Sequence, residues 1–394
     1  MAGPWLLGPG DGDGTTDARA LLIAVHRQDE DEDGPGSELS LRELERLAEA
    51  DGLTVAGTLV QSRGRPDPAT YLGSGKAGEL ADEVARTRAT VVIADGELTP
   101  AQARNLQDRA GVRVVDRTAL ILDIFAGHAR SREGRLQVEL AQIAYQLPRL
   151  RGGGREMSRV GGGRTAGGAG IGVRGPGEMR LELQRRRLRQ RAARLREGAG
   201  ELALRRERTR HRRARNLIPS VAVTGYTNAG KSALVNRLAG ADLQTRDEPF
   251  ATLDPAVRRV TVDGRTFTLT DTVGFVRHLP HQLVDAFRST LEEVSHSDLA
   301  LHVVDASAPD ALNQITTVHG VLHEIGAGAV PELLVLNKID IAPPEWVDAL
   351  QRAYPEAVAV SALTGDRVVA LRTAVAARLR DLGRPGRLVG RYRE

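Results

Sequence analysis

The stretch 220–238, SVAVTGYTNAGKSALVNRL, decides the architecture of the second half of the chain. A short apolar run at 221–224 reads as a buried strand, and residues 233–238 begin a helix. Between them, a glycine loop matching G-x-x-x-x-G-K-[ST] lies in the context of a phosphate-binding loop, whose backbone N–H groups and following helix N-terminus point at phosphate. The residues expected to bind nucleotide here are Gly225, Tyr226, Thr227, Asn228, Ala229, Gly230, Lys231 and Ser232.

Side-chain chemistry assigns separate roles within and beyond this loop. The Lys231 ammonium is expected to reach the β- and γ-phosphates, and the Ser232 hydroxyl to ligate Mg²⁺. Asp271, at the end of the expected strand 266–270, is placed to hold Mg²⁺ through water, while the Gly274 N–H meets the γ-phosphate. Thr252, in a polar loop between these motifs, is the expected second hydroxyl ligand of Mg²⁺. Lys231, Thr252 and Gly274 are therefore the predicted catalytic residues.

Two motifs after later strands predict which base is bound. The motif NKID at 337–340 follows an apolar strand at 332–336, and the carboxylate of Asp340 can accept from the ring N–H and the exocyclic amine of guanine. The tripeptide at 361–363 follows a strand at 358–360, and its N–H groups can donate to the guanine carbonyl oxygen. The predicted base-site residues are Asn337, Lys338, Asp340, Ser361, Ala362 and Leu363. Their order along the chain predicts GTP as the nucleotide.

The remaining pattern of this half predicts a Ras-like P-loop G domain with a mainly parallel sheet. The pair Asp263-Gly264 reads as a hairpin turn between strands 257–262 and 265–270, which adds one antiparallel strand. Phe275 occupies the position of the water-orienting glutamine of Ras-type GTPases, so intrinsic hydrolysis is expected to be slow. Asn228 resembles the asparagine of potassium-activated GTPases, and a loop-capping role fits it equally, so K⁺ dependence stays open.

The first half of the chain predicts a second, smaller α/β domain. Apolar runs read as buried strands and alternate with helical patterns, which implies a small parallel sheet covered by helices. The expected strands are 20–25, 53–60, 90–94 and 112–115, and the expected helices are 37–50, 76–88, 100–110 and 117–126. A further amphipathic helix at 136–147 is expected to end near Pro148.

A glycine- and arginine-rich middle region separates these two domains. Residues 152–177 contain 12 Gly, and this loop reads equally as a plain linker or as an RNA-contacting loop that orders on binding. From Arg180 to Arg215 there are 15 Arg and four Glu, a net charge of +11. Gly198-Ala199-Gly200 interrupts its apolar heptad spacing, so an antiparallel, Arg-rich helical hairpin is expected, with phosphate contacts to nucleic acid favoured over a solvated face.

Overall composition excludes several classes of protein. A chain of 394 residues with no Cys has no thiolate catalysis, disulfide framework or Cys-ligated metal. Its N-terminus lacks a signal-peptide pattern, and no apolar stretch approaches the roughly 20 residues that span a bilayer, so a cytoplasmic protein without stable membrane insertion is expected. The predicted division is a disordered leader 1–18, an α/β domain 19–150, a loop 151–177, a hairpin 178–216, a G domain 217–383 and a tail 384–394.

The combined motifs resemble the HflX family of translation-factor-class GTPases. The matching segments are YLGSGK at 71–76, ELAQ at 139–142, LPRL at 147–150, GPGE at 175–178, GYTNAGKS at 225–232, FATLDP at 250–255, DTVGFVRHLPH at 271–281, STLEE at 289–293 and NKID at 337–340. The resemblance implies a GTP hydrolase stimulated by the large ribosomal subunit, with ribosomal RNA as a partner, that splits stalled or idle ribosomes under stress. A monomer is expected, although the sequence does not determine whether the chain dimerises. An extra glycine-rich stretch and Met179-Arg180 after GPGE depart from the family pattern.

Two other interpretations remain. The chain can be a GTP-gated binding module whose partner is a protein or a membrane surface, and salt-sensitive ribosome binding with ribosome-stimulated hydrolysis distinguishes the two. A weaker alternative gives the first domain its own ATP-dependent RNA-remodelling activity. The GSGK segment at 73–76 lacks the upstream glycine of a phosphate-binding loop, however, and is expected to form a structural turn.

Overall fold

The computed structural model describes residues 18–26, 36–150, 176–215, 218–240, 249–250, 257–277, 281–383 and 387–388. Contacts divide the chain into two compact units, residues 1–127 with 135–199 and residues 128–134 with 200–394. The predicted leader and the predicted Gly/Arg-rich loop lie almost entirely outside the described residues. Among the described residues, no helix is both long and apolar enough to cross a bilayer.

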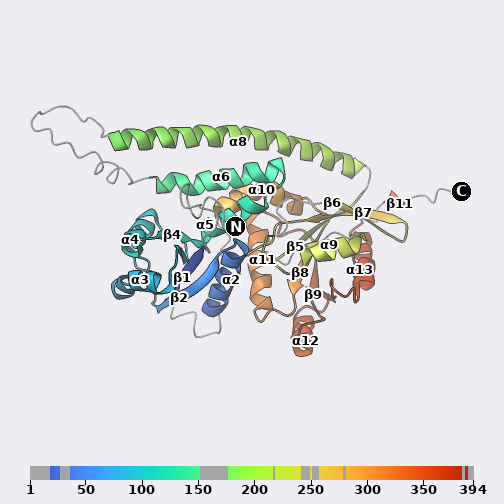
Figure 1. Ribbon diagram of the computed structural model, residues 1–394. Helices are drawn as coiled ribbons and strands as arrows, with labels where there is room; N and C mark the ends of the chain where they lie inside the picture. Colours follow the sequence, from blue (N-terminus) through green and yellow to red (C-terminus); the bar gives the residue numbers. More distant parts are fainter. Residues whose placement is uncertain are drawn as a thin grey trace, which may run out of the picture. The chain divides into compact units, whose positions relative to one another are not determined.

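The first unit is built on a four-stranded parallel sheet, as its sequence pattern predicts. The strand order is β2-β1-β3-β4, and the side chains of Leu21, Ile23 and Val92 are fully buried in the core between sheet and helices. The elements, shown in Figure 1, are β1 (Arg19–His26), α2 (Gly36–Ala50), β2 (Thr54–Ser62), α3 (Ser74–Thr87), β3 (Val91–Ala94), α4 (Pro100–Ala110), β4 (Arg113–Asp116) and α5 (Arg117–His128).

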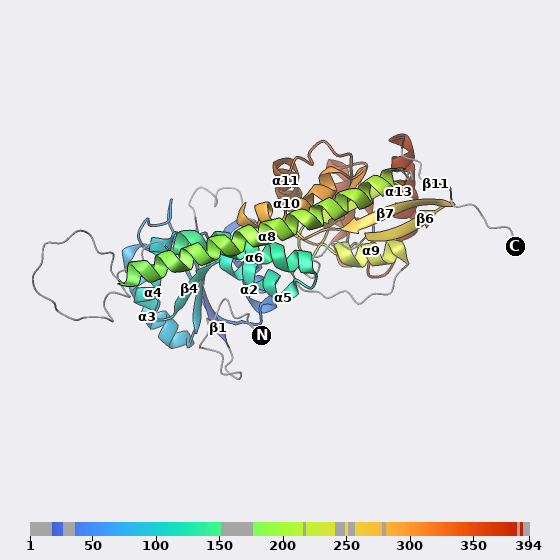
Figure 2. The same cartoon turned by 90° about the horizontal axis from the view of Figure 1, so that it is seen from above.

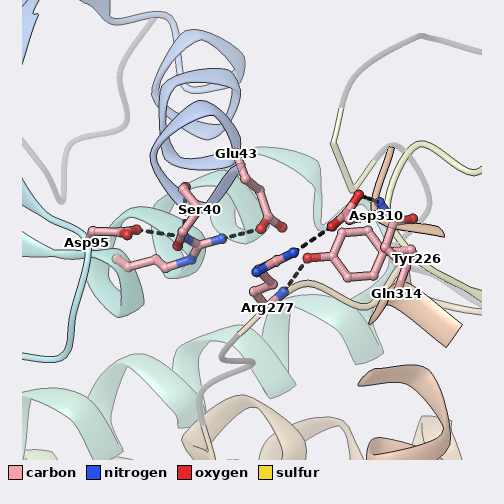
Figure 3. A network of polar contacts seen from close by, with 8 residues as sticks. Ser40, Glu43, Asp95, Tyr226, Arg277, Asp310 and Gln314 are labelled. Carbon is pink, nitrogen blue, oxygen red and sulfur yellow. Dashed lines mark hydrogen bonds and ion pairs between the residues drawn. The ribbon is translucent and has the colours of Figure 1, made fainter. Parts of the chain in front are cut away.

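A buried arginine organises the edge of this sheet at which the strands end. Arg117 is only 2% exposed, and its guanidinium pairs with Asp95, which follows β3, and with Glu43 of α2, both at 2.7 Å. Figure 3 shows these two carboxylates and Ser40 around the guanidinium. Because a buried cation is costly unless carboxylates pair with it, this cluster ties α2 to the strand ends.

The GSGK segment forms the start of a helix rather than the expected turn. Gly73 is the N-cap of α3, and Lys76 lies in its first turn, where its ammonium pairs with Glu79 at 3.0 Å. The helix buries Ala77, Leu80 and other apolar residues at helical spacing, so the polar residues before them supply the outward-facing first turn.

The arginine-rich segment forms one helix, so the predicted hairpin within 178–216 is wrong. Helix α8 runs without interruption through Pro176–Arg215, which corresponds to about 60 Å at 1.5 Å per residue. Its partner is α6 (Arg132–Arg149), which ends one residue after Pro148, and the two helices lie side by side in Figures 1 and 2. Their shared apolar seam consists of Leu136, Leu140, Ile143, Leu147, Leu188, Ala192 and Leu195.

Packing explains why the two glycines do not end the helix. Neither Gly198 nor Gly200 has the positive φ of a helix C-cap, and each costs only about 1 kcal/mol relative to Ala in a helix. A Cβ built on Gly198 would lie 3.5 Å from Leu136 Cδ1, an ordinary van der Waals contact, so α6 packs against α8 at this point of the helix. The sequence pattern marked a break where the tertiary structure has a close helix contact.

The second unit contains a mainly parallel seven-stranded sheet. Its order is β10-β9-β8-β5-β7-β11, with β6 and β11 both antiparallel to β7, and residues 263–264 form the predicted hairpin turn. Its elements are β5 (Ser220–Gly225), α9 (Lys231–Ala239), β6 (Val257–Val262), β7 (Arg265–Asp271), α10 (His281–Ser295), β8 (Leu299–Asp305), α11 (Ala311–Glu324), β9 (Glu332–Asn337), α12 (Pro344–Ala353), β10 (Val358–Ala359), α13 (Val368–Asp381) and β11 (Arg387–Leu388).

The parallel register brings the predicted motifs to one edge of this sheet. Strands β5, β7, β8, β9 and β10 pair in parallel over a core that includes Val223, Leu301 and Val335. The loops after their carboxyl ends are therefore neighbours, and ligands of open α/β sheets bind at this edge.

Candidate nucleotide-binding site

Two glycines shape the loop between β5 and α9. Gly225 has φ +143°, and a Cβ there would overlap the carbonyl oxygen of Val303 on β8. Gly230 has φ +87°, and its Cβ would overlap the side-chain amide of Asn337. Because only glycine meets both the conformational and the steric demand, these positions let the loop curl tightly over the strand ends.

The segment after β7 lies directly beside this loop. The Thr227 N–H donates to the Phe275 carbonyl at 2.7 Å, and the Phe275 N–H donates to the Gly225 carbonyl at 3.1 Å. Tyr226 accepts at its hydroxyl from the Arg277 N–H at 2.6 Å, and the Arg277 guanidinium pairs with Asp310, as Figure 3 shows. The two predicted phosphate-contacting segments are thus held to each other by backbone hydrogen bonds.

Lys231 lies buried between these segments. Its ammonium donates to the Tyr226 carbonyl at 2.7 Å, and a Cβ built on Gly274 would lie 3.0 Å from that ammonium. Burial lowers the pKa of Lys231 from 10.5 to about 8, and the nearby Asp271 carboxylate partly opposes this shift. An anion that binds here would therefore contact the Lys231 ammonium, which is already in place and largely removed from solvent.

Ser232 and Asp271 lie next to each other beside this lysine. The Ser232 hydroxyl donates to an Asp271 carboxylate oxygen at 2.6 Å. Asp271 ends β7, and Ser232 stands in the first turn of α9. Hydroxyl and carboxylate oxygens are the hard ligands that Mg²⁺ prefers, so this pair fits that ion.

Asn337 links the phosphate loop to the base loop. Its side-chain amide donates to the Ala229 carbonyl at 2.8 Å, and its side-chain oxygen accepts from the Ala362 N–H at 2.9 Å. Lys338, with φ +66°, pairs with Asp305 at 2.8 Å, and Asp340 is exposed. The structure therefore brings the NKID and 361–363 segments together beside the glycine loop.

Arg237 is a site residue that the sequence analysis missed. From α9 its guanidinium donates to the Ala362 carbonyl at 3.2 Å and to the Leu363 carbonyl at 2.5 Å, 125 residues or more away in sequence. Ser361 is fully buried in the same loop and accepts at its hydroxyl from the Thr364 N–H. No local motif marks Arg237, because its partners are backbone oxygens that only the sheet order brings within reach.

The sequence also singled out Thr252, Asn228 and Phe275 for nucleotide chemistry. Thr252 lies outside the described residues. Asn228 has φ +59°, a left-handed conformation that Asn tolerates better than most residues, so its loop role has a local physical reason. Phe275 is completely buried, and its side chain belongs to the core.

Comparison with known proteins identifies the family. Models of a GTP-binding GTPase N-terminal region, a GTP-binding GTPase middle region and a 50S ribosome-binding GTPase match residues 38–126, 128–213 and 220–338. The GTPase HflX of Caldanaerobacter subterraneus is 50% identical over 82% of this chain and 73% of its own length. That of Escherichia coli K12 is 42% identical over 92% and 83%.

Among solved structures, a GTP-binding protein of Sulfolobus solfataricus in complex with GDP is 24% identical, covers 93% of this chain and 99% of its own, and has a TM-score of 0.45. The curated relatives span both units and retain 40–50% identity, well above what a shared fold alone requires. The chain therefore belongs to the HflX family of GTPases, enzymes that bind GTP and hydrolyse it.

Proposed function

We propose that the loop 225–232 holds the phosphates of GTP, with Lys231 on the β- and γ-phosphates and Gly274 donating its N–H to the γ-phosphate. The observation that carries this proposal is the buried Lys231 ammonium beside Gly274, framed by a loop that requires glycine at both ends. Preorganised donors in a desolvated site stabilise the charge that develops during phosphoryl transfer.

Ser232 and Asp271 are proposed to hold Mg²⁺, with Thr252 as a further ligand on sequence grounds alone. The 2.6 Å hydrogen bond between the first two side chains supports this set, because it holds two oxygen atoms that Mg²⁺ accepts next to each other. When bound, Mg²⁺ neutralises negative charge on the β- and γ-phosphates. The dependence of hydrolysis on K⁺ through Asn228 remains a prediction.

The base site is proposed to be formed by Asp340 and the loop 361–363. Asp340 is exposed, so its carboxylate is accessible to the N–H groups of an incoming guanine. Hydrogen bonds from the loop to Asn337 and Arg237 hold the loop in place. We infer that Arg237 positions this loop, so that its backbone N–H groups face the guanine carbonyl oxygen.

Arg237→Ala is expected to weaken GDP binding roughly 5- to 30-fold, equivalent to about 1–2 kcal/mol for lost hydrogen bonds to a charged donor. The control Arg372→Ala removes a half-buried arginine that likewise donates to a backbone carbonyl, that of Thr261, away from this loop. Isothermal titration with GDP measures both variants. Equal affinity of the Arg237 variant and the parent chain would show that the loop positions itself without this contact.

The Lys231 side chain is expected to titrate near pH 8 in the nucleotide-free chain, and GDP is expected to move the midpoint upward because phosphate favours the ammonium. The chain has only three lysines, so carbon-13 NMR of lysine-labelled protein resolves them, and Lys231→Met identifies the signal. In the unfolded chain this lysine has a pKa of 10.5, so between pH 8 and 10.5 the unfolded chain still binds the proton that the folded chain has lost. The free energy of unfolding of the nucleotide-free chain is therefore expected to rise with pH over this range. A midpoint above 10 without nucleotide contradicts the prediction.

Helix α8 is proposed as the surface that docks on ribosomal RNA of the large subunit. The ion pairs found among the described residues involve Arg185, Arg191 and Arg206 of this helix. They leave a set of exposed arginines that have no carboxylate partner within the described part of the chain: Arg180, Arg186, Arg187, Arg189, Arg194, Arg196, Arg205 and Arg208. A continuous helix with such a face matches a polyanion, whose phosphates release counterions on binding.

We infer that the chain is a cytoplasmic GTPase that binds the ribosome in its GTP form and splits or rescues stalled or idle ribosomes under stress. A ligand shifts an equilibrium only through differential affinity, so the γ-phosphate must change the segments around Thr252 and Gly274. The match to a 50S ribosome-binding GTPase model and the charge of α8 support this over a GTP-gated module with a protein or membrane partner.

GTP turnover is expected to rise at least about tenfold on addition of purified large ribosomal subunits, because buried Phe275 offers no side chain to orient water and a partner must supply that function. Phosphate release is measured with large subunits, with small subunits and with neither. Stimulation by large subunits alone supports the proposal, and unchanged turnover favours the non-ribosomal module.

A further inference from the structure

A cluster of two histidines and one glutamate lies in the second unit, among side chains that the nucleotide site does not use. His302 comes from β8, His319 from α11 and Glu332 from the start of β9. The Glu332 carboxylate is 2.5 Å from His302 Nδ1 and 2.9 Å from His319 Nε2. All three potential ligand atoms lie within 4.8 Å of one another, although the residues span 30 positions in sequence.

Burial and charge set the chemical character of this cluster. His302 is fully buried, and burial lowers the pKa of its imidazole. Burial raises the pKa of the Glu332 carboxylate, but the hydrogen bonds and charges of the two imidazoles outweigh this effect and lower it overall. The side chains of His319 and Glu332 are 43% and 30% exposed, so the cluster opens to solvent on one side.

We propose that His302, His319 and Glu332 form a binding site for one Zn²⁺ ion. Two imidazoles and one carboxylate are a donor set that Zn²⁺ accepts, with solvent completing the fourth position. At bond lengths of about 2.0–2.2 Å the ligand atoms of a tetrahedral site lie about 3.4 Å apart, so small side-chain rotations adapt this cluster to the ion.

The direction of the His302 ring identifies the ligand nitrogen. Its Nδ1 faces Glu332, whereas Nε2 is buried and has no hydrogen-bond partner among the described residues. Nδ1 is therefore the nitrogen available to a metal, and the rings of His302 and His319 meet edge to face with centroids 5.5 Å apart. Because the ligands come from two adjacent strands and the helix between them, a bound ion would cross-link the β8–α11–β9 segment.

The test uses the full-length, tag-free chain, stripped of metals and loaded with Mg²⁺ and GDP so that the oxygen ligands near the nucleotide are occupied. Zn²⁺ is titrated by calorimetry, and the intensity of the visible absorption of Co²⁺ reports whether the bound ion is four-coordinate. His319→Asn removes the half-exposed ligand with least risk to the fold, and Glu332→Gln keeps the shape of the carboxylate. His323→Asn, one turn further along α11 and outside the cluster, is the matched control.

We expect one equivalent of Zn²⁺ to bind the parent chain and the His323 variant, and to raise their Tm. Affinity should fall at least about 100-fold in the His319 and Glu332 variants, more than loss of an outer hydrogen-bond partner usually costs. No saturable binding to the parent chain, or equal binding to all variants, would overturn the proposal and leave Glu332 as a hydrogen-bond acceptor for two histidines.

Discussion

Replacing Lys231 by alanine is expected to lower the rate of GTP hydrolysis by about 10²–10³-fold, equivalent to about 3–4 kcal/mol of transition-state stabilisation. The physical reason is the position of its ammonium, which is buried against Tyr226 and Gly274 where the terminal phosphates are proposed to lie. Negative charge develops there during transfer, and the alanine variant has no cation at this position to stabilise it. The measurement is phosphate release at saturating GTP over several hours.

Lys76→Ala is the matched control, because the chain contains only three lysines and this one is a partly exposed residue in the first unit. Its turnover should equal that of the parent chain. The Tm of the Lys231 variant shows whether the fold is retained. A Tm equal to or above that of the parent chain means that a slower turnover reflects lost chemistry and not lost structure. Turnover of the Lys231 variant within about threefold of the parent would contradict the proposed role.

Changing five exposed arginines of α8 to glutamine is expected to weaken binding to the large ribosomal subunit by roughly 10²–10³-fold at physiological salt, with intrinsic GTP turnover unchanged. Each arginine–phosphate contact that is lost also reduces the steepness of the plot of log affinity against log salt concentration by about 1. Binding by the variant should therefore depend less on salt. The substituted positions are Arg186, Arg187, Arg189, Arg194 and Arg196.

An equal loss of charge elsewhere provides the control for this prediction. The exposed residues Arg46, Arg65, Arg109, Arg352 and Arg380, changed together to glutamine, remove the same five charges without touching α8. Co-sedimentation with large subunits over a series of salt concentrations compares the two variants. Equal affinity of both variants would mean that net charge, and not the α8 face, governs binding.

The nucleotide motifs were predictable because each is local. GYTNAGKS, DTVG and NKID combine glycine, lysine and carboxylate at spacings typical of a strand–loop–helix geometry, and in the structure hydrogen bonds join these three segments. Most of the buried parallel strands were also predictable, because they read as continuous apolar runs, whereas β8 was not identified and β11 lies in the segment predicted as a tail.

The two incorrect secondary-structure predictions fall where the local preference of glycine and the packing of the folded chain favour different conformations. Gly198 and Gly200 favour a helix break when read alone, yet α6 packs against this part of α8 and the helix continues. In GSGK the glycines suggested a turn. The apolar residues that follow at helical spacing from Ala77 bury one face of a helix, and this helix begins within GSGK. In both segments the burial of an apolar face outweighed about 1 kcal/mol of propensity per glycine.

The amino-acid sequence alone determined the family resemblance, the two α/β patterns and the candidate residues for phosphate, Mg²⁺ and guanine, because these depend on residue type and short-range spacing. Only the tertiary structure revealed the hold of Arg237 on residues 362–363, the bridge made by Asn337 and the His302–His319–Glu332 cluster. These contacts join residues brought together by strand order, and strand order follows from the burial of apolar surface over the whole domain rather than from any local pattern.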